Sequence, residues 1–347
     1  MLTVSAYGAT SATEPLAAMT TERRDFGPHD VLIEIKYCGI CHTDISHARS
    51  EWRPEPYPLI PGHEFTGIVT ATGTGVSRHA VGDRVGVGCM VGSCGECRSC
   101  HKGQEQYCLA GTTLTYGSID RDGTVTQGGY STHVVVDQDF VLPIPDGIDL
   151  AQAAPLLCAG ITAYSPLRRW GTGPGTKVAV IGLGGLGHLA VKLAHAIGAE
   201  ITVLSQSLKK RDDALRLGAS HYYATSDAET FGKLAGAFDL IVNTVSATIN
   251  ADAYLSLLAL DGVLANVGVA TEPLSLHGST LVSQRRIITG SLIGGISETR
   301  EMLGFCAQHH LGAEIEVIPA GKINEAYERV LASDVRYRFV IDNSTLA

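Results

Sequence analysis

From about residue 176 onward, short apolar runs alternate with stretches of helical periodicity. Residues 178–181 form an apolar, β-branched run, which is typical of a strand buried on both faces. The next apolar residues recur at three- and four-residue intervals, which predicts a helix ending at Gly198. They are Leu186, Leu189, Ala190, Leu193, Ala194 and Ile197. Further strands are predicted at residues 201–204, 221–224, 238–244 and 262–268. This alternation predicts a doubly wound parallel sheet with helices on both faces.

Three glycines connect the first of these strands to the helix. Gly182, Gly184 and Gly187 follow the GxGxxG spacing. Glycines in such a turn let the backbone approach a pyrophosphate, and the helix N-terminus attracts its negative charge. An ordinary tight turn is the alternative, but the flanking strand and helix favour dinucleotide binding.

The first half of the chain has a different pattern. Residues 31–37 and 67–71 are predicted strands, and the proline-rich residues 53–58 must form a loop. Short strands separated by glycine and proline continue to about residue 141, which predicts a mostly β domain with long loops. Two more helices are predicted at residues 297–308 and 322–331. A length of 347 residues suits two domains better than one.

The charge balance narrows the classes of partner. The chain has 26 basic and 35 acidic residues and a formal net charge of −9, which argues against nucleic acid or an anionic membrane as the main partner. No apolar run approaches the roughly 20 residues of a membrane span, and the N-terminus lacks the pattern of a signal peptide. We therefore expect a cytoplasmic, reducing location, where the nine cysteines are thiols or metal ligands.

Four cysteines lie close together in the sequence. They are Cys94, Cys97, Cys100 and Cys108, with gaps of two, two and seven residues. Four thiolates so spaced favour a closed tetrahedral structural zinc site. An iron–sulfur cluster shares the CxxCxxC start, and a pair of disulfides is the other alternative. Outside this group, Cys38, Cys89 and Cys306 are interpreted as small apolar fillers.

A second metal site is suggested by three residues that are far apart in sequence. Taken singly, Cys41, His63 and Cys158 are more typical of buried thiols and a hydrogen-bonded histidine. Taken together, two thiolates and a neutral imidazole would leave zinc one open position for chemistry. Their spacing alone does not prove that they meet.

The residues after the second predicted strand indicate which dinucleotide binds. NAD-binding sites place Asp or Glu here to bind the ribose hydroxyls. This chain instead has residues 205–211, Ser-Gln-Ser-Leu-Lys-Lys-Arg, whose hydroxyls and cations could hold a 2′-phosphate. A solvated helix start is the alternative, but cations at a helix N-terminus oppose its dipole. We predict contacts from Ser205, Ser207 and Lys210, with Arg211 a lesser candidate.

The chain resembles the zinc-dependent medium-chain alcohol dehydrogenases, and within them the cinnamyl-alcohol-dehydrogenase-like NADP(H)-dependent aldehyde reductases. The matching stretches are residues 38–44, 61–64, 94–108, 155–162, 182–187 and 334–340. The resemblance implies a GroES-like mostly-β catalytic domain at residues 1–152 and 294–347, and a Rossmann domain at 153–293. It also implies reversible hydride transfer between NADPH and aromatic or medium aliphatic aldehydes, two zinc ions per subunit, and pairing of subunits near residues 286–293 into a homodimer.

The same resemblance implies roles for individual residues. Cys41, His63 and Cys158 would bind the catalytic zinc, with Glu64 behind it and Asp44 orienting His63. Thr43 would exchange a proton with the substrate oxygen. His42 and Arg338 would face the pyrophosphate of the cofactor. The remaining cofactor positions would be Thr162, Gly182, Leu183, Gly184, Gly185, Leu186, Gly187, Ser205, Gln206, Ser207, Lys210, Arg211, Thr244, Gly268, Ser291, Leu292 and Ile293.

The chain departs from the family at one position. The histidine often found five residues after the first zinc cysteine is replaced by Ser46, and His47 follows it. Either His47 has taken over the proton relay or the relay ends in water. Trp52, Tyr116 and Ile293 are guesses for an apolar substrate pocket. A polyol or sugar dehydrogenase on the same scaffold is the nearer alternative function, and a non-enzymatic NADPH-sensing or nucleic-acid-binding zinc protein the more distant one.

Overall fold

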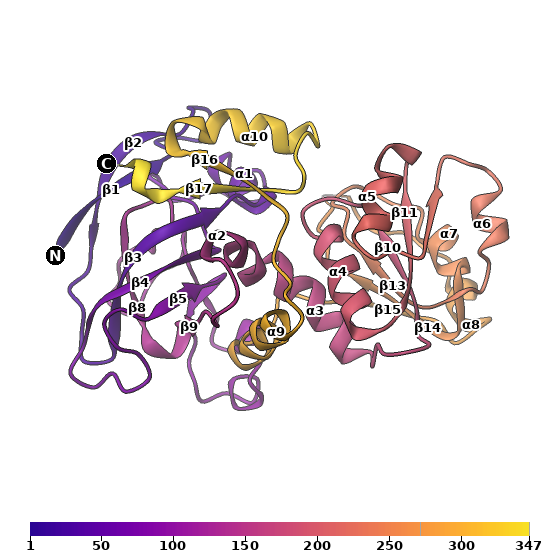
Figure 1. The fold of residues 1–347 in the computed structure, drawn as a ribbon, viewed down its shortest axis with the longest axis horizontal. Coiled ribbons are helices and arrows are strands. Elements are labelled where there is room, and N and C mark those ends of the chain that lie inside the picture. The colour runs from indigo at the N-terminus through magenta and orange to yellow at the C-terminus, as the bar shows by residue number, and fades with distance from the viewer. Residues whose placement is uncertain (271, 347) are drawn as a thin grey trace. The chain divides into compact units, whose positions relative to one another are not determined.

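The computed structural model describes residues 1–270 and 272–346, and the chain divides into two compact units (Figure 1). The first unit joins Met1–Cys158 to Gly294–Ala347, and the second is the continuous stretch Ala159–Ile293. The domain limits implied by the family resemblance remain a prediction. No helix in the described part of the chain is long and apolar enough to cross a membrane.

The second unit is built on a six-stranded parallel sheet. The strands are β10 (Lys177–Ile181), β11 (Glu200–Ser205), β12 (His221–Ala224), β13 (Phe238–Asn243), β14 (Leu258–Asn266) and β15 (Ile287–Gly290). Their spatial order is β12-β11-β10-β13-β14-β15, which is the doubly wound order of dinucleotide-binding sheets. The apolar runs predicted as strands are buried because helices cover both faces of the sheet.

The helices of this unit follow the strands. They are α3 (Ala159–Arg169), α4 (Gly187–Ile197), α5 (Arg211–Arg216), α6 (Thr230–Lys233), α7 (Ala251–Ser256) and α8 (Gly278–Val282). In Figure 1, α3 and α4 lie on one side of the sheet, and α6, α7 and α8 lie on the other. Gly198 ends α4 in the left-handed conformation, at φ +100°, as the pattern predicted.

The first unit is mostly β. Its main sheet has the order β16-β17-β3-β4-β5-β9, with β8 also paired to β3. These strands are β3 (Asp30–Gly39), β4 (Phe65–Thr72), β5 (Arg84–Val87), β8 (His133–Asp137), β9 (Leu142–Pro143), β16 (Ile315–Pro319) and β17 (Arg338–Asp342). Two antiparallel two-stranded sheets accompany it, β1 (Leu2–Gly8) with β2 (Ala17–Arg23), and β6 (Met90–Gly92) with β7 (Thr113–Leu114). The first unit thus has the mostly β architecture that was predicted.

Four α-helices complete the described part of the first unit. They are α1 (His42–Ala48), α2 (Leu150–Ala153), α9 (Ile296–Gln308) and α10 (Ile323–Leu331). The last two agree closely with the predicted helices at 297–308 and 322–331. α1 and α2 were not predicted, because a helix of seven residues or fewer spans too few turns to show a periodic pattern.

Candidate active site

Strand β3 and helix α1 position the first candidate ligand. β3 ends at Gly39, and Cys41 is the residue before α1, with an extended backbone at φ −107° and ψ 153°. The carboxylate of Asp44 reaches back and accepts a hydrogen bond of 2.9 Å from the Cys41 backbone N–H. Cys41 therefore caps the start of α1, and its position is fixed from the first turn of that helix.

The fold brings Cys41, His63 and Cys158 together. Their ligand atoms all lie within 4.8 Å of one another, and all three side chains are buried. The His63 Nε2 atom lies 3.2 Å from the Cys158 sulfur, while Nδ1 lies 2.8 Å from an oxygen of Asp44. Two sulfurs and one imidazole nitrogen facing a common point are a donor set that suits zinc. The residues present therefore fit the metal that the resemblance implies.

The two thiols of this cluster interact strongly. Hydrogen bonding with Cys158 holds the pKa of Cys41 well below its ordinary value, although burial opposes the shift. Hydrogen bonding with Cys41, and then with Cys89, raises the pKa of Cys158 well above its ordinary value, and burial adds to this. Cys41 is thus the first of the two to ionise. Cys89, interpreted from the sequence as an apolar filler, has its thiol beside Cys158.

Asp44 is the centre of a buried hydrogen-bond network. Its side chain has no exposed surface and accepts hydrogen bonds from the backbone N–H groups of Cys41 and Gly62 as well as from His63. The hydroxyl of Tyr130, 3.3 Å away, is a further donor. Burial alone would lower the pKa of His63, but the charge of Asp44 helps to raise it well above its ordinary value. Asp44 thus fixes which imidazole nitrogen faces the thiols.

Glu64 and Arg338 form a buried ion pair behind the cluster. Neither side chain has more than 5% of its surface exposed, and an Arg338 Nη2 group donates to Glu64 Oε1. Burial raises the pKa of Glu64 to about 7, although the charge of Arg338 opposes this. A side chain at Gly39 would place its Cβ 2.2 Å from Glu64 Oε1, so Gly39 leaves the space that the carboxylate occupies. Nothing in the sequence paired these two residues.

Ser46, at the position of the family's proton-relay histidine, and its neighbour His47 both contact carboxylates. Ser46 donates a hydrogen bond of 2.7 Å to Glu51, and His47 Nδ1 lies 2.7 Å from an oxygen of Glu55. The His47 ring meets the rings of Trp52 and Tyr116 edge-on, with centroids 5.3 and 5.4 Å away. Tyr116 also lies 5.8 Å from the His63 ring, so it connects His47 to the metal-ligand cluster. His47 is therefore part of the aromatic surface beside the cluster.

Three further residues of the first unit were predicted to contact substrate or cofactor: His42, Thr43 and Arg338. The first two lie in the first turn of α1, where His42 is exposed and Thr43 is half-buried. Arg338 is paired with Glu64, and its contact with a pyrophosphate remains a prediction. The structure thus places Thr43 next to Asp44 on the helix that carries Cys41.

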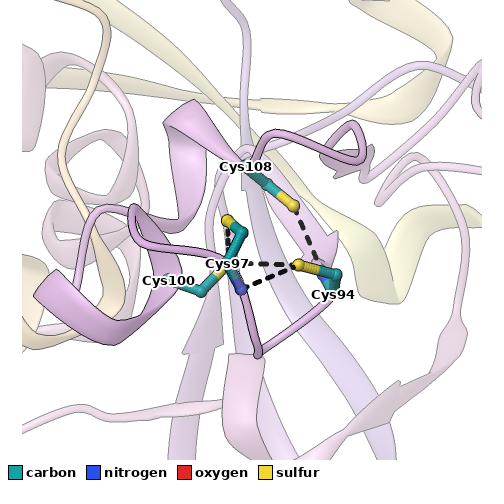
Figure 2. Close-up of side chains that lie close together, drawn as sticks. All are labelled: Cys94, Cys97, Cys100 and Cys108. Atoms are coloured by element: carbon teal, nitrogen blue, oxygen red, sulfur yellow. Dashed lines mark hydrogen bonds between the residues drawn. The ribbon is translucent and has the colours of Figure 1, made fainter.

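The four cysteines of the second metal motif also come together (Figure 2). The sulfurs of Cys94 and Cys97 lie 3.9 and 3.5 Å from that of Cys100. A tetrahedron of Zn–S bonds of about 2.3 Å would separate its sulfurs by about 3.8 Å, so these distances fit zinc. Backbone N–H groups point at the sulfurs of Cys94 and Cys108, each at 3.4 Å. All nine cysteines, which lie within the described residues, are free thiols, so no disulfide competes for this cluster.

In the second unit, each glycine of the turn has a separate structural reason. Gly182 has φ +87°, which a tight turn needs and which other residues adopt rarely. A Cβ at Gly187 would lie 2.2 Å from the Gly182 carbonyl oxygen, so α4 packs directly against the turn. A Cβ at Gly184 would meet no protein atom within 4 Å. Gly184 therefore faces a cradle that a side chain would fill, where a pyrophosphate can approach the backbone.

This difference between the glycines gives a matched pair of substitutions. Gly184→Ala is expected to change the free energy of unfolding by less than about 1 kcal/mol, because the new methyl group meets no protein atom. It should weaken NADPH binding about tenfold or more, measured by quenching of tryptophan fluorescence. Gly187→Ala should instead destabilise the protein by about 1–3 kcal/mol, because its methyl group overlaps the Gly182 carbonyl. Wild-type NADPH affinity in Gly184→Ala would show that the cradle does not hold the pyrophosphate.

The residues that follow β11 lie beside the glycine turn. The Lys210 ammonium donates a hydrogen bond of 2.9 Å to the carbonyl of Leu183, within the turn itself. Ser205 is half-buried at the end of β11, whereas Gln206, Ser207 and Arg211 are exposed. Ser207 also lines a cavity of about 450 Å³ together with residues of β12. The structure thus groups these residues at one end of the sheet, next to Gly184.

The remaining predicted cofactor positions are spread along the carboxyl ends of neighbouring strands. Thr244, directly after β13, donates to the carbonyl of Ile181 at 2.7 Å. Gly268, just beyond β14, lines a cavity of about 200 Å³. Ser291, the residue after β15, donates from its backbone N–H to Asn266 at 3.1 Å. Thr162 is buried in α3. Ligands of doubly wound sheets bind at this end of the strands.

Comparison with known proteins agrees with this architecture. The alcohol dehydrogenase GroES-like domain family matches residues 27–146, and the zinc-binding dehydrogenase family matches residues 185–308. The chain therefore belongs to the zinc-binding alcohol dehydrogenases of the medium-chain class.

Individual relatives cover nearly the whole chain. The NADP-dependent alcohol dehydrogenase C 1 of Mycolicibacterium smegmatis is 63% identical over 347 residues, which cover 100% of this chain and 99% of the relative. The aldehyde reductase YahK of Escherichia coli is 51% identical and covers 99% of each chain. Among solved structures, a cinnamyl alcohol dehydrogenase from Sorghum bicolor superposes with a TM-score of 0.96 at 41% identity, covering 99% of this chain and 98% of the other. The fold and the family predicted from the sequence are confirmed.

Proposed function

We propose that this protein is a zinc-dependent, NADP(H)-dependent alcohol dehydrogenase that interconverts alcohols and aldehydes, with aldehyde reduction as the favoured direction. The observation that carries the proposal is the buried Cys41–His63–Cys158 cluster, whose histidine is held by Asp44. A relative named as an NADP-dependent alcohol dehydrogenase and another named as an aldehyde reductase support the same activity. The substrate is a small molecule, and we propose aromatic and medium-chain aliphatic aldehydes, with broad specificity.

Residues of the first unit would bind the two metal ions and move the proton. Cys41, His63 and Cys158 would hold the catalytic zinc, and the four-cysteine lobe would hold the structural zinc. When bound, zinc would supply a Lewis acid for the substrate oxygen, and NADPH would supply the hydride. Thr43, one residue before Asp44 on α1, would move the proton to or from the substrate oxygen. Asp44 would keep the His63 Nε2 atom available as a ligand.

The second unit would bind the cofactor. Gly184 leaves the backbone open to the pyrophosphate, and Lys210, anchored on Leu183, supplies a cation beside it. Ser205, Ser207 and Lys210 would bind the 2′-phosphate, since no acidic residue is present among residues 205–211 to repel it. Trp52 and Tyr116 would provide apolar surface for the substrate in the first unit.

We also propose a homodimer that works in the cytoplasm. Strand β15 (Ile287–Gly290) is an edge strand of the six-stranded sheet, and its first residue Ile287 and the nearby Leu292 are exposed apolar side chains. An exposed edge of this kind is a ready site for pairing with another subunit. A reducing compartment would keep the nine cysteines as thiols.

The test is kcat/KM for an aromatic aldehyde with NADPH and with NADH. We expect a strong preference for NADPH in the wild type. In Ser205→Asp the preference should fall by about tenfold or more, because a carboxylate at the strand end would repel the 2′-phosphate and suit a ribose hydroxyl. Ser220→Asp, which adds the same charge at an exposed position before β12, at the opposite end of the sheet, serves as the control. An unchanged preference in Ser205→Asp would contradict the assignment of this binding site.

A further inference from the structure

The four-cysteine lobe of the first unit is attached to the start of helix α9. Two short helical turns of the lobe, η1 (Cys100–Lys102) and η2 (Glu105–Tyr107), are joined through Gly103. The Glu105 Oε2 atom accepts a hydrogen bond of 3.1 Å from the backbone N–H of Ile296, the first residue of α9. A carboxylate at this position satisfies a free N–H group and interacts favourably with the helix dipole.

The contact around this hydrogen bond is backbone against backbone. A Cβ at Gly295 would lie 1.8 Å from the Gly103 carbonyl oxygen and 2.7 Å from Glu105 Oε2. A Cβ at Gly103 would lie 2.7 Å from the Ser297 hydroxyl, and Gly103 also has φ +65°. Neither glycine has room for a side chain. The lobe and the helix start therefore meet closely, with Glu105 as the charged group in the contact.

Helix α9 is also where the chain returns from the second unit to the first. The residues just before it, 291–293, are among the cofactor positions that the family resemblance implies, and we include them in the proposed cofactor site. Ser291 is tied to the sheet by its backbone N–H, which donates to Asn266 at 3.1 Å. Ile296 is tied to Glu105 by its own N–H. Between these ties, Ile293 has φ +39°, a costly conformation for a β-branched residue that the surroundings must hold in place.

We propose that Glu105 is a positioning residue for the cofactor. By tethering Ile296, it lets the four-cysteine lobe hold residues 291–293 in the conformation that binds NADPH. The backbone of Glu105 is itself fixed, because its carbonyl accepts a hydrogen bond of 2.8 Å from Thr112. The structural metal lobe would then contribute to cofactor affinity as well as to stability. This inference rests on the proposed function, since it needs NADPH as the ligand of residues 291–293.

The experiment compares Glu105→Ala and Glu105→Gln with Glu96→Ala, which removes an exposed carboxylate from the same lobe. We expect Glu105→Ala to raise both the KM and the directly measured Kd for NADPH about three- to tenfold, the effect of losing a helix cap. kcat should stay within about twofold, and two zinc ions per chain should remain bound. Hydrogen exchange of the amides at residues 291–297 should become faster. Glu105→Gln, which keeps an oxygen acceptor, should recover part of the affinity, and Glu96→Ala should match the wild type.

The outcomes separate the two proposals. Wild-type protein that reduced no aldehyde with NADPH would overturn the proposed function, and with it this inference. A wild type that uses NADPH, with unchanged KM, Kd and hydrogen exchange in Glu105→Ala, would overturn only the role of Glu105. Loss of one zinc ion from both Glu105 variants, with wild-type zinc content in Glu96→Ala, would also overturn it, because Glu105 would then serve the folding of the lobe.

Discussion

Replacing His63 with alanine should reduce aldehyde turnover by about three orders of magnitude or more and lower the zinc content from two ions per chain to one. A Lewis acid contributes several kcal/mol to such a reaction, and about 1.4 kcal/mol corresponds to a tenfold change in rate. His63 supplies the only nitrogen in a cluster whose other ligands are the thiols of Cys41 and Cys158. The measurements are steady-state turnover with NADPH and the metal content after dialysis.

The lost ion should be the one in the buried cluster. The four-cysteine lobe does not include His63, so its ion should stay bound. His221→Ala, which removes a half-exposed histidine from the second unit, is the matched control and should keep both ions and full turnover. Two ions and wild-type turnover in His63→Ala would rule out the cluster as the catalytic metal site.

The second large effect is expected from the ion pair behind the cluster. Arg338→Met should destabilise the protein by about 3–5 kcal/mol, because it leaves the carboxylate of Glu64 buried without its cation. Glu64 has no exposed surface, and its Oε2 atom already has no hydrogen-bond partner. The double variant Glu64→Gln/Arg338→Met should regain part of this loss, since no charge is then left unpaired. The measurement is the free energy of unfolding in urea, without cofactor.

An exposed ion pair provides the comparison. Arg78 and Asp139 are 2.8 Å apart, with side chains 59% and 62% exposed. Arg78→Met should change the stability by less than about 1 kcal/mol, because water screens the pair. A similarly small effect in Arg338→Met would mean that the carboxylate of Glu64 is readily neutralised or solvated when Arg338 is absent.

The elements that the sequence predicted well are those with long, regular patterns. The run at residues 178–181 is buried on both faces. The glycine turn needs a positive φ, and the helix up to Ile197 has a clear helical period. The start of strand β14 was not predicted, because its pattern is irregular. It starts at Leu258, four residues before the predicted start, and runs through Asp261 and Gly262. Asp-Gly normally indicates a turn, and Asp261 has φ +63°, so the irregularity that hid the strand is real.

From the residues alone, metal ligands could be predicted only where they lie in one short motif. The four cysteines lie within fifteen consecutive residues, 94–108, so their spacing alone indicated a metal. Cys41, His63 and Cys158 needed the family resemblance, because no local pattern says that residues so far apart meet. Glu64 and Arg338 are 274 positions apart, and Tyr130 reaches Asp44 of α1 from a loop 86 positions away. Such contacts arise from tertiary packing, which leaves no periodic trace in the sequence.

The division of the first unit into two stretches of sequence affects the order in which the protein can fold during synthesis. Residues 159–293 form a continuous unit that can assemble as soon as it leaves the ribosome. Strand β3, which leads to Cys41, can pair with β4 and β8 first, but Gly39 and Cys38 lack their partners Val340 and Ile341 until β17 is made. Arg338 is made 274 residues after Glu64, so Glu64 lacks its cation while the residues between them are synthesised. A nascent chain stalled before residue 338 would therefore expose the edge of β3 that pairs with β17 and leave Glu64 without its cation, and an exposed sheet edge favours aggregation.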